Sequence, residues 1–100
     1  MSLLIRTIQK EKQRIDYMLN VYTERLDELP KGSVTVKKNG QNIYYYLKYR
    51  AGQKVITEYL GKDEEKVGQI RAQLEKRRHI EAMIKSLREE QVLACKVLEG

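Results

Sequence analysis

The sequence predicts an α+β protein in which a long helix, a three-stranded antiparallel β-meander and a second long helix follow one another (α–βββ–α). Three observations predict this fold class: an apolar stripe with heptad spacing before residue 30, turn signals between alternating runs, and a return to helical periodicity after residue 62. The chain has 100 residues, of which 41% are hydrophobic. We therefore expect residues 1–100 to form a single domain with a small core.

Residues 1–29 predict the first helix. Apolar residues recur with heptad spacing, and Pro30 and Gly32 stop the pattern. Because a helix of this length cannot bury its apolar stripe alone, it needs a neighbouring element to cover the stripe. The stripe contains Met1, Ile8, Ile15, Tyr22 and Leu29.

Residues 33–60 predict a β-meander. Runs rich in valine, threonine and tyrosine are separated by Asn39-Gly40, a strong hairpin signal, and by Ala51-Gly52. Turns centred on these two dipeptides set the register of the three strands. The expected cross-strand pairs are Val36–Ile43, Val34–Tyr45 and Leu47–Ile56.

Side chains alternate across a strand, so this meander has two different faces. One face carries the apolar pairs and is expected to pack on helices. The other face gathers phenols, hydroxyls and cations. It consists of Thr35, Lys37, Tyr44, Tyr46, Lys48, Arg50, Val55, Thr57 and Tyr59.

Residues 63–98 predict the second helix, with Asp63 as its N-cap. Its apolar stripe changes face at residues 76–79, where the helix either bends or begins to pack on a different neighbour. We expect the latter: the first half covers the meander and the first helix, and the second half pairs with another chain. The first stripe contains Val67, Ile70 and Leu74, and the second contains Ile80, Ile84, Leu87, Ala94 and Leu98. The residues expected to form the helix packing and a homodimer are Ile8, Ile15, Tyr22, Ile80, Ile84 and Leu87.

Positive charge is concentrated in the meander. The chain carries 20 lysines and arginines against 14 acidic residues, and residues 30–62 hold seven of these cations but only one acid, Glu58. Concentrated positive charge indicates an anionic partner, and neighbouring tyrosines can stack on bases or bond to phosphates. We therefore expect the open face to bind nucleic acid, DNA rather than RNA. The expected phosphate contacts are Lys37, Lys48, Arg50 and Lys54, and the expected tyrosine contacts are Tyr44, Tyr46 and Tyr59.

Two other interpretations of this face stay open. Tyrosine, threonine and lysine are ordinary residues for the solvated side of a sheet, in which case the chain is a structural coiled-coil dimer. The same tyrosines are also suited to anchoring a protein partner. In that case the chain is an inhibitor or adaptor, for example an anti-defence or anti-CRISPR-like protein, that docks on a nucleic-acid-processing enzyme.

The stretch YYYLKYRAGQKVITEYLGKDEEKV resembles hairpins in two settings. It resembles small uncharacterised proteins of bacteria and phages, and the start of some insertion-sequence transposases, in which a tyrosine-rich strand precedes R-x-G-x-K and Y-L-G-K. It is similar, more loosely, to the arm-type DNA-binding domain of phage integrases, where a three-stranded sheet reads the major groove. The matching positions are Tyr44 to Tyr46, Arg50, Gly52, Lys54, Tyr59, Gly61 and Lys62.

This resemblance implies a mobile-element origin and contact with DNA or with proteins that handle DNA. The chain departs from the integrase pattern, because a long heptad helix precedes the sheet and no catalytic domain follows it. A self-standing recombinase is therefore not expected.

No pattern in the sequence indicates catalysis. His79 is the only histidine and lies in a charged helical turn, and Cys95 is the only cysteine. Glycine-rich phosphate loops and metal-ligand spacings are absent, so we expect no enzyme activity, no metal and no cofactor. The lone cysteine and the lack of a signal peptide or membrane span predict a cytoplasmic protein without membrane association.

Overall fold

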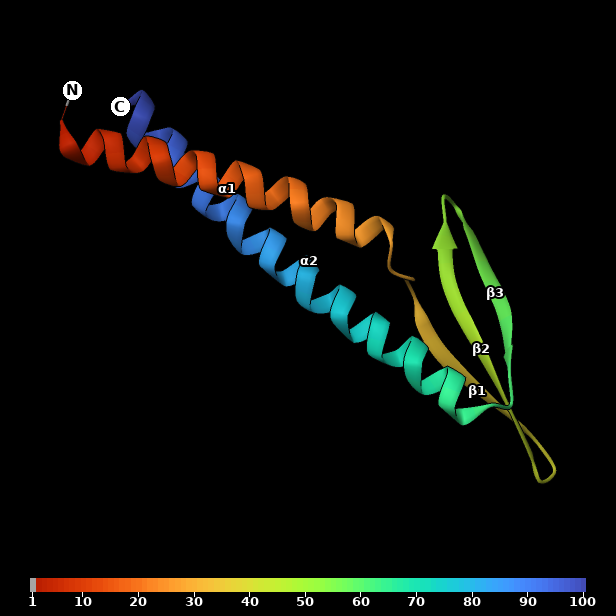
Figure 1. The fold of residues 1–100 in the computed structure, drawn as a ribbon. Helices are drawn as coiled ribbons and strands as arrows, with labels where there is room; N and C mark the ends of the chain where they lie inside the picture. The colour runs from red at the N-terminus through yellow and green to blue at the C-terminus, as the bar shows by residue number, and fades with distance from the viewer. Residues whose placement is uncertain (1) are drawn as a thin grey trace. The chain divides into compact units, whose positions relative to one another are not determined.

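The structure is a computed structural model that describes residues 2–100. Its order of elements confirms the predicted α–βββ–α fold class (Figure 1). Met1, which we included in the first helix and its stripe, lies outside the described residues. The elements are α1 (Leu3–Asp27), β1 (Ser33–Asn39), β2 (Asn42–Ala51), β3 (Lys54–Gly61) and α2 (Glu64–Glu99).

The chain divides into two compact units. Within the described residues, the helical unit consists of residues 2–28 and His79–Gly100, and the sheet unit consists of Leu29–Arg78. Helix α2 is continuous in backbone hydrogen bonding across this division and contributes one half to each unit. The division falls where the sequence pattern places the change of apolar stripe, so the two halves of α2 do pack on different neighbours.

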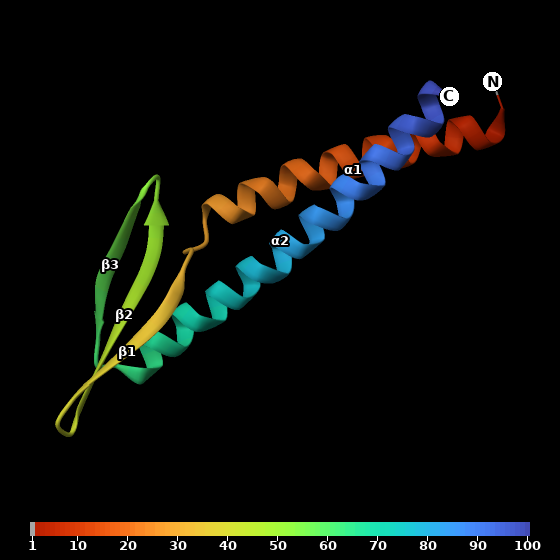
Figure 2. The same ribbon diagram turned by 180° about the vertical axis from the view of Figure 1, so that it is seen from behind.

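In the helical unit, α1 and the second half of α2 run antiparallel (Figures 1 and 2). Helix α1 begins after Ser2, whose Oγ accepts a hydrogen bond from the Ile5 backbone N–H at 3.1 Å. Between the helices, the Gln91 side-chain amide donates to Asp16 Oδ1 at 2.7 Å. The buried residues of this unit are Ile15, Ile80, Ile84, Leu87 and Ala94.

The packing partner of the second α2 stripe differs from our prediction. We expected Ile80, Ile84 and Leu87 to pair with another chain, but they are buried within a single chain. Helix α1 supplies the neighbour in this unit, so the second half of α2 packs on α1. Ile8 and Tyr22, the other predicted packing residues, are half-buried.

In the sheet unit, β2 lies between β1 and β3 in an antiparallel sheet. Asp63 caps α2 as predicted, because its Oδ1 accepts from the Glu65 backbone N–H at 3.0 Å. The first half of α2 covers only part of the predicted apolar face: Leu47 is buried with Val67 and Leu74, whereas Val36 and Ile43 remain exposed. We expect this small core to hold the sheet on the helix.

The strand register differs from our prediction by two residues. Val36 lies opposite Tyr45 rather than Ile43, because the turn is formed by Gly40 and Gln41. A turn centred on Asn39-Gly40 with the preferred geometry needs an asparagine with positive φ, and no non-glycine residue among residues 2–100 has one. Gly40 and Gly52 instead occupy the first central turn positions, with φ of 65° and 64°. The other expected pairs are replaced by Val34–Leu47, Leu47–Glu58 and Tyr49–Ile56.

The faces of the sheet are unaffected by this error. A shift of two residues preserves the alternation of side chains, whereas a shift of one residue would exchange the faces.

No helix within the described part of the chain is both long and apolar enough to cross a membrane.

Candidate nucleic-acid interface

The candidate site is the face of the sheet opposite to the one that packs on α2. The strand register places Lys37 opposite Tyr44, and it places Tyr46 between Thr35 and Tyr59. All nine residues predicted for this face therefore lie on it. Lys62 also lies on this face, because its Nζ is beside the Tyr44 ring. We call this surface the tyrosine face, and define it as Thr35, Lys37, Tyr44, Tyr46, Lys48, Arg50, Val55, Thr57, Tyr59 and Lys62.

Three tyrosine rings form a contact series on this face. The Tyr59 ring centroid lies 5.4 Å from that of Tyr46 and 6.3 Å from that of Tyr44, with the ring planes inclined at 52° and 47°. Tilted pairs at these separations are favourable for aromatic rings. Tyr44 and Tyr46 are half-buried, whereas Tyr59 is 58% exposed. Tyr59 is therefore the ring best placed to contact a flat group of a partner.

Two lysines lie over the rings. Lys37 Nζ is 5.1 Å from the Tyr46 centroid, and Lys62 Nζ is 4.8 Å from the Tyr44 centroid. Lys62 also donates to Asn42 Oδ1 at 3.3 Å. These distances allow cation–π attraction, which holds the ammonium groups near the sheet surface without neutralising them. The phenols thus position positive charge.

Lys62 is a site residue that our sequence reasoning missed. The cause is a β-bulge: Tyr46 pairs with Tyr59, but Tyr45 pairs with Gly61, so Leu60 is an extra residue in β3. Without the bulge, alternation would turn Lys62 to the α2 side. With it, Lys62 lies beside Tyr44. The Y-L-G-K motif contains both the bulge and Lys62. A glycine within a strand pattern often marks a bulge, so Gly61 was the sequence signal from which this bulge could have been predicted.

The remaining predicted cations divide between the two faces. Lys48 and Arg50 are exposed on the tyrosine face, opposite Thr57 and Val55. Lys54, which we expected among the phosphate contacts, does not share this face. It pairs with Ala51 beside a turn, and as the neighbour of Val55 it projects to the opposite side.

The only acid between residues 30 and 62 lies on the other face. Glu58 is opposite Leu47, and its Oε1 accepts a hydrogen bond from the Tyr49 hydroxyl at 2.6 Å. This hydrogen bond raises the pKa of the Tyr49 hydroxyl above its usual value, with smaller contributions from burial and from the Glu58 charge. The tyrosine face therefore presents four cations and no carboxylate.

The two compact units differ in net charge. The sheet unit contains twelve lysines and arginines against five acidic residues, a net charge of +7. The helical unit contains eight against nine, a net charge of −1. An anionic partner is therefore attracted to the sheet unit and not to the helical unit.

Residues considered for catalysis lie elsewhere. His79 is exposed on α2, and Cys95 is half-buried on the same helix. Among residues 2–100, no group of three or more histidine, cysteine, aspartate or glutamate side chains is arranged to hold a metal ion.

These features define a class: a small basic α+β protein whose sheet exposes an aromatic and cationic face. The chain belongs to the family described as "Domain of unknown function (DUF6788)", whose model matches residues 3–69. The matched region includes α1, all three strands and the whole tyrosine face. No curated protein and no solved structure matches the chain.

Proposed function

We propose that this chain is a small cytoplasmic DNA-binding protein of a bacterial mobile element or phage, and that it binds DNA through the tyrosine face. The observation that carries the proposal is the composition of that face. Three tyrosines, two of which contact the ring of the third, share one side of the sheet with four cations, and the only acid in the strands, Glu58, is on the other side.

The cations supply most of the expected affinity. Lys37 and Lys62 are held against the rings, so they lose less side-chain freedom on meeting a phosphate than unrestrained lysines would. Lys48 and Arg50 extend the positive surface along β2. Each phosphate contact releases condensed counterions, which makes the binding strongly dependent on salt.

The three tyrosines differ in exposure, and their exposure determines what each can contact. Tyr44 and Tyr46 are half-buried and lie beside lysines, so they serve mainly to position charge. Tyr59 is more exposed and can stack on a base or sugar or donate its hydroxyl to a phosphate oxygen. The face has no histidine or carboxylate to act as a general base, which favours binding without catalysis.

A protein partner is the second candidate, and one observation favours it. Val55 and Tyr59 are both large apolar side chains exposed on the tyrosine face, at 52% and 58%. Exposed aromatic anchors of this kind are common at protein interfaces. In this case the chain is an inhibitor or adaptor that docks on a nucleic-acid-processing protein.

Fluorescence anisotropy with short labelled duplex and single-stranded DNA tests the first candidate. We expect saturable binding at low salt that weakens steeply as salt is added. A parallel capture from bacterial lysate, with and without nuclease, tests the second candidate. A saturable protein complex that survives nuclease, together with no binding to either DNA at low salt, would overturn the DNA-binding proposal.

A further inference from the structure

The second half of α2 carries two adjacent heptad stripes. One stripe is Ile80, Ile84, Leu87, Gln91, Ala94 and Leu98, which faces the interior of the helical unit. The other row, which we call the second α2 stripe, is shifted by one residue and is apolar at three of its six positions: it contains Met83, Leu93 and Val97, together with His79, Ser86 and Glu90. A helix with one neighbour needs only the first stripe, so the exposed apolar residues of the second row are available to pack on another neighbour.

The second stripe borders an open groove of about 340 Å³ on one side of the helical unit. Leu93 and Val97 are 63% and 46% exposed, although they are as apolar as the residues in the core. A second hollow of about 260 Å³ continues along α2 beside Met83 and Ser86. The first groove is lined by Ile8, Glu11, Arg14, Ile15, Glu90, Leu93, Ala94 and Val97.

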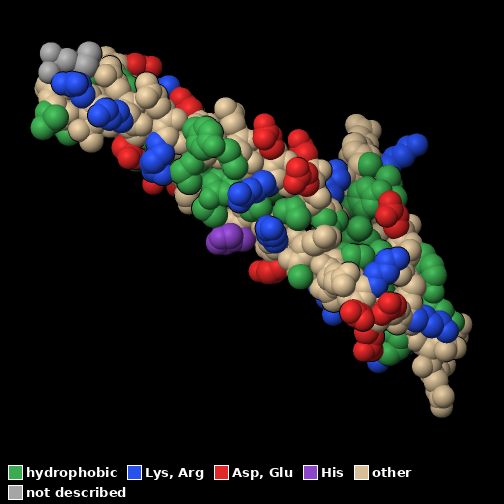
Figure 3. All heavy atoms as spheres, viewed as in Figure 1, with side chains coloured by type: hydrophobic (Ala, Val, Ile, Leu, Met, Phe, Trp, Pro, Cys, Tyr) green, Lys and Arg blue, Asp and Glu red, His purple; other side chains and the backbone are tan. Residues whose placement is uncertain are grey.

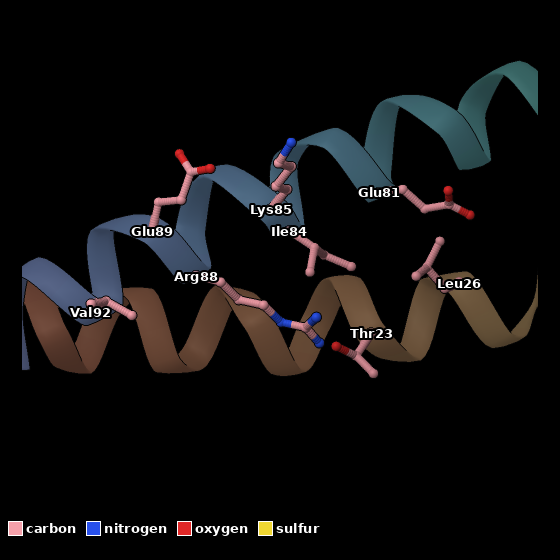
Figure 4. Close-up of a pocket in the computed structure, with 8 residues that line it drawn as sticks. All are labelled: Thr23, Leu26, Glu81, Ile84, Lys85, Arg88, Glu89 and Val92. Atoms are coloured by element: carbon pink, nitrogen blue, oxygen red, sulfur yellow. The ribbon is translucent and has the colours of Figure 1, made fainter.

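The opposite side of the helical unit is different. There, the Arg88 side chain extends from α2 across α1 toward Thr23 (Figure 4). The groove on this side has a volume of about 440 Å³, and four of its eight lining residues are charged and three are apolar: Glu81, Lys85, Arg88 and Glu89, and Leu26, Ile84 and Val92. On this side, the charged Arg88 side chain thus lies over the opening, whereas Lys85 and Glu89 point away from α1 (Figure 4). Figure 3 shows that hydrophobic side chains are also exposed over the helices. Five of the eight residues that line the groove beside Leu93 are apolar, against three of eight on the opposite side, so it is the better docking surface of the two.

The charges of the groove favour a second copy of this chain as its occupant. Arg14 Nη2 lies 2.9 Å from Glu11 Oε2, and Glu90 lines the same groove, so the groove carries both signs of charge. A two-fold interface uses the same patch on both partners, which requires that the patch be self-complementary. Since the helical unit has a net charge of −1, two copies also meet there with little repulsion. Nucleic acid is a poor occupant for the same reason.

We propose that the groove formed by α1 and the second α2 stripe is a homodimer interface in which two helical units associate as a four-helix bundle. The interface uses Leu93, Val97 and Met83, and not the buried residues Ile80, Ile84 and Leu87 that the sequence pattern suggested for this role. The inference does not depend on DNA binding, because the groove and the tyrosine face belong to different units.

Sedimentation equilibrium over a wide range of concentration tests the interface with two adjacent substitutions. Leu93→Glu places a charge in the groove, and Val92→Glu, its matched control, places one on the opposite side at a similarly exposed position. We expect the unmodified protein to dimerise and Leu93→Glu to raise the dimer dissociation constant by about tenfold or more. We expect Val92→Glu to leave the dissociation constant within about twofold.

Circular dichroism of both variants at a concentration where each is monomeric separates loss of the interface from loss of the fold. If Leu93→Glu unfolds, Leu93→Ala provides the same test with a smaller change and should weaken the dimer while keeping the helical signal. The proposal is overturned if the unmodified protein stays monomeric up to near-millimolar concentration. It is also overturned if Val92→Glu, and not the change at Leu93, dissociates the dimer.

Discussion

The rings of Tyr46 and Tyr59 contact each other across β2 and β3, with centroids 5.4 Å apart and planes inclined at 52°. Cross-strand aromatic pairs stabilise antiparallel sheets. The register of β3 changes immediately beside this pair, so the contact also helps to fix where Gly61 and Lys62 lie. The stability of the sheet and the layout of the proposed binding face are therefore linked through Tyr46 and Tyr59.

Replacing Tyr59 tests the role of the exposed ring. We expect Tyr59→Ala to weaken binding of single-stranded DNA by about 1–3 kcal/mol, the usual contribution of one base stacked on an aromatic ring. Tyr59→Phe should retain most of the affinity, since it keeps the ring and loses only the hydroxyl. Tyr17→Ala is the control, because Tyr17 is 70% exposed but belongs to the helical unit. Equal losses from Tyr59→Ala and Tyr17→Ala in anisotropy titrations would contradict this role.

Replacing Lys62 tests the consequence of the bulge in β3. Lys62→Met keeps the length of the side chain and removes its charge beside Tyr44. We expect the slope of log K against log salt to fall by about 0.9, as for the loss of one phosphate contact. Lys54→Met removes the same charge from the opposite face and should change the slope less. The interpretation of the bulge fails if the two variants have the same slope.

Gly32 and Gly52 provide a matched pair for backbone strain. Both have positive φ, of 109° and 64°, but only at Gly32 would a Cβ collide with the neighbouring strand, at the Lys48 carbonyl oxygen and 2.8 Å from Tyr49 Cβ. We expect Gly52→Ala to lower the free energy of unfolding by about 1 kcal/mol and Gly32→Ala to lower it by at least about 2 kcal/mol. Urea denaturation measures both, and a smaller effect at Gly32 than at Gly52 would be inconsistent with the close approach of the strands.

We expect Asp16 to make the helical unit sensitive to acid. Hydrogen bonds from Gln91 and then from Lys12 lower the pKa of the Asp16 carboxyl below its usual value. A lowered folded-state pKa contributes stability that is present above the unfolded-state pKa and is lost as the pH falls through the folded-state value. Urea midpoints followed by helical circular dichroism should therefore decrease between about pH 5 and pH 3. In Asp16→Asn the decrease should be smaller, and an identical decrease would exclude Asp16 as a contributor.

The two faces of the sheet could be predicted from the sequence because alternation is a strong constraint. An error of two residues in the turns left Tyr44, Tyr46 and Arg50 on the predicted side. The register itself could not be predicted, because it depended on which residue adopts positive φ, and Asn39-Gly40 was misleading. Lys62 was missed because one extra residue in β3 reverses the alternation beyond it.

The partners of the helices were harder to predict than the helices themselves. The stripe through Ile80 and Ile84 indicates that something covers it, but a pattern does not say whether the cover comes from the same chain or from another. In the structure both residues are buried within one chain, with α1 as the neighbouring helix. Because α1 covers the stripe through Ile80 and Ile84, the adjacent row through Leu93 is the one that remains exposed.

The most direct test of DNA binding through the tyrosine face compares two double variants with equal loss of charge. Lys48→Ala with Arg50→Ala removes two cations from the tyrosine face, and Lys38→Ala with Lys54→Ala removes two from the opposite face of the same sheet. Anisotropy titrations of duplex DNA across a salt series should show the slope of log K against log salt reduced by about two for the first variant and by much less for the second. Equal slopes for both variants, or no binding by the unmodified protein at low salt, would contradict the assignment of DNA binding to this face.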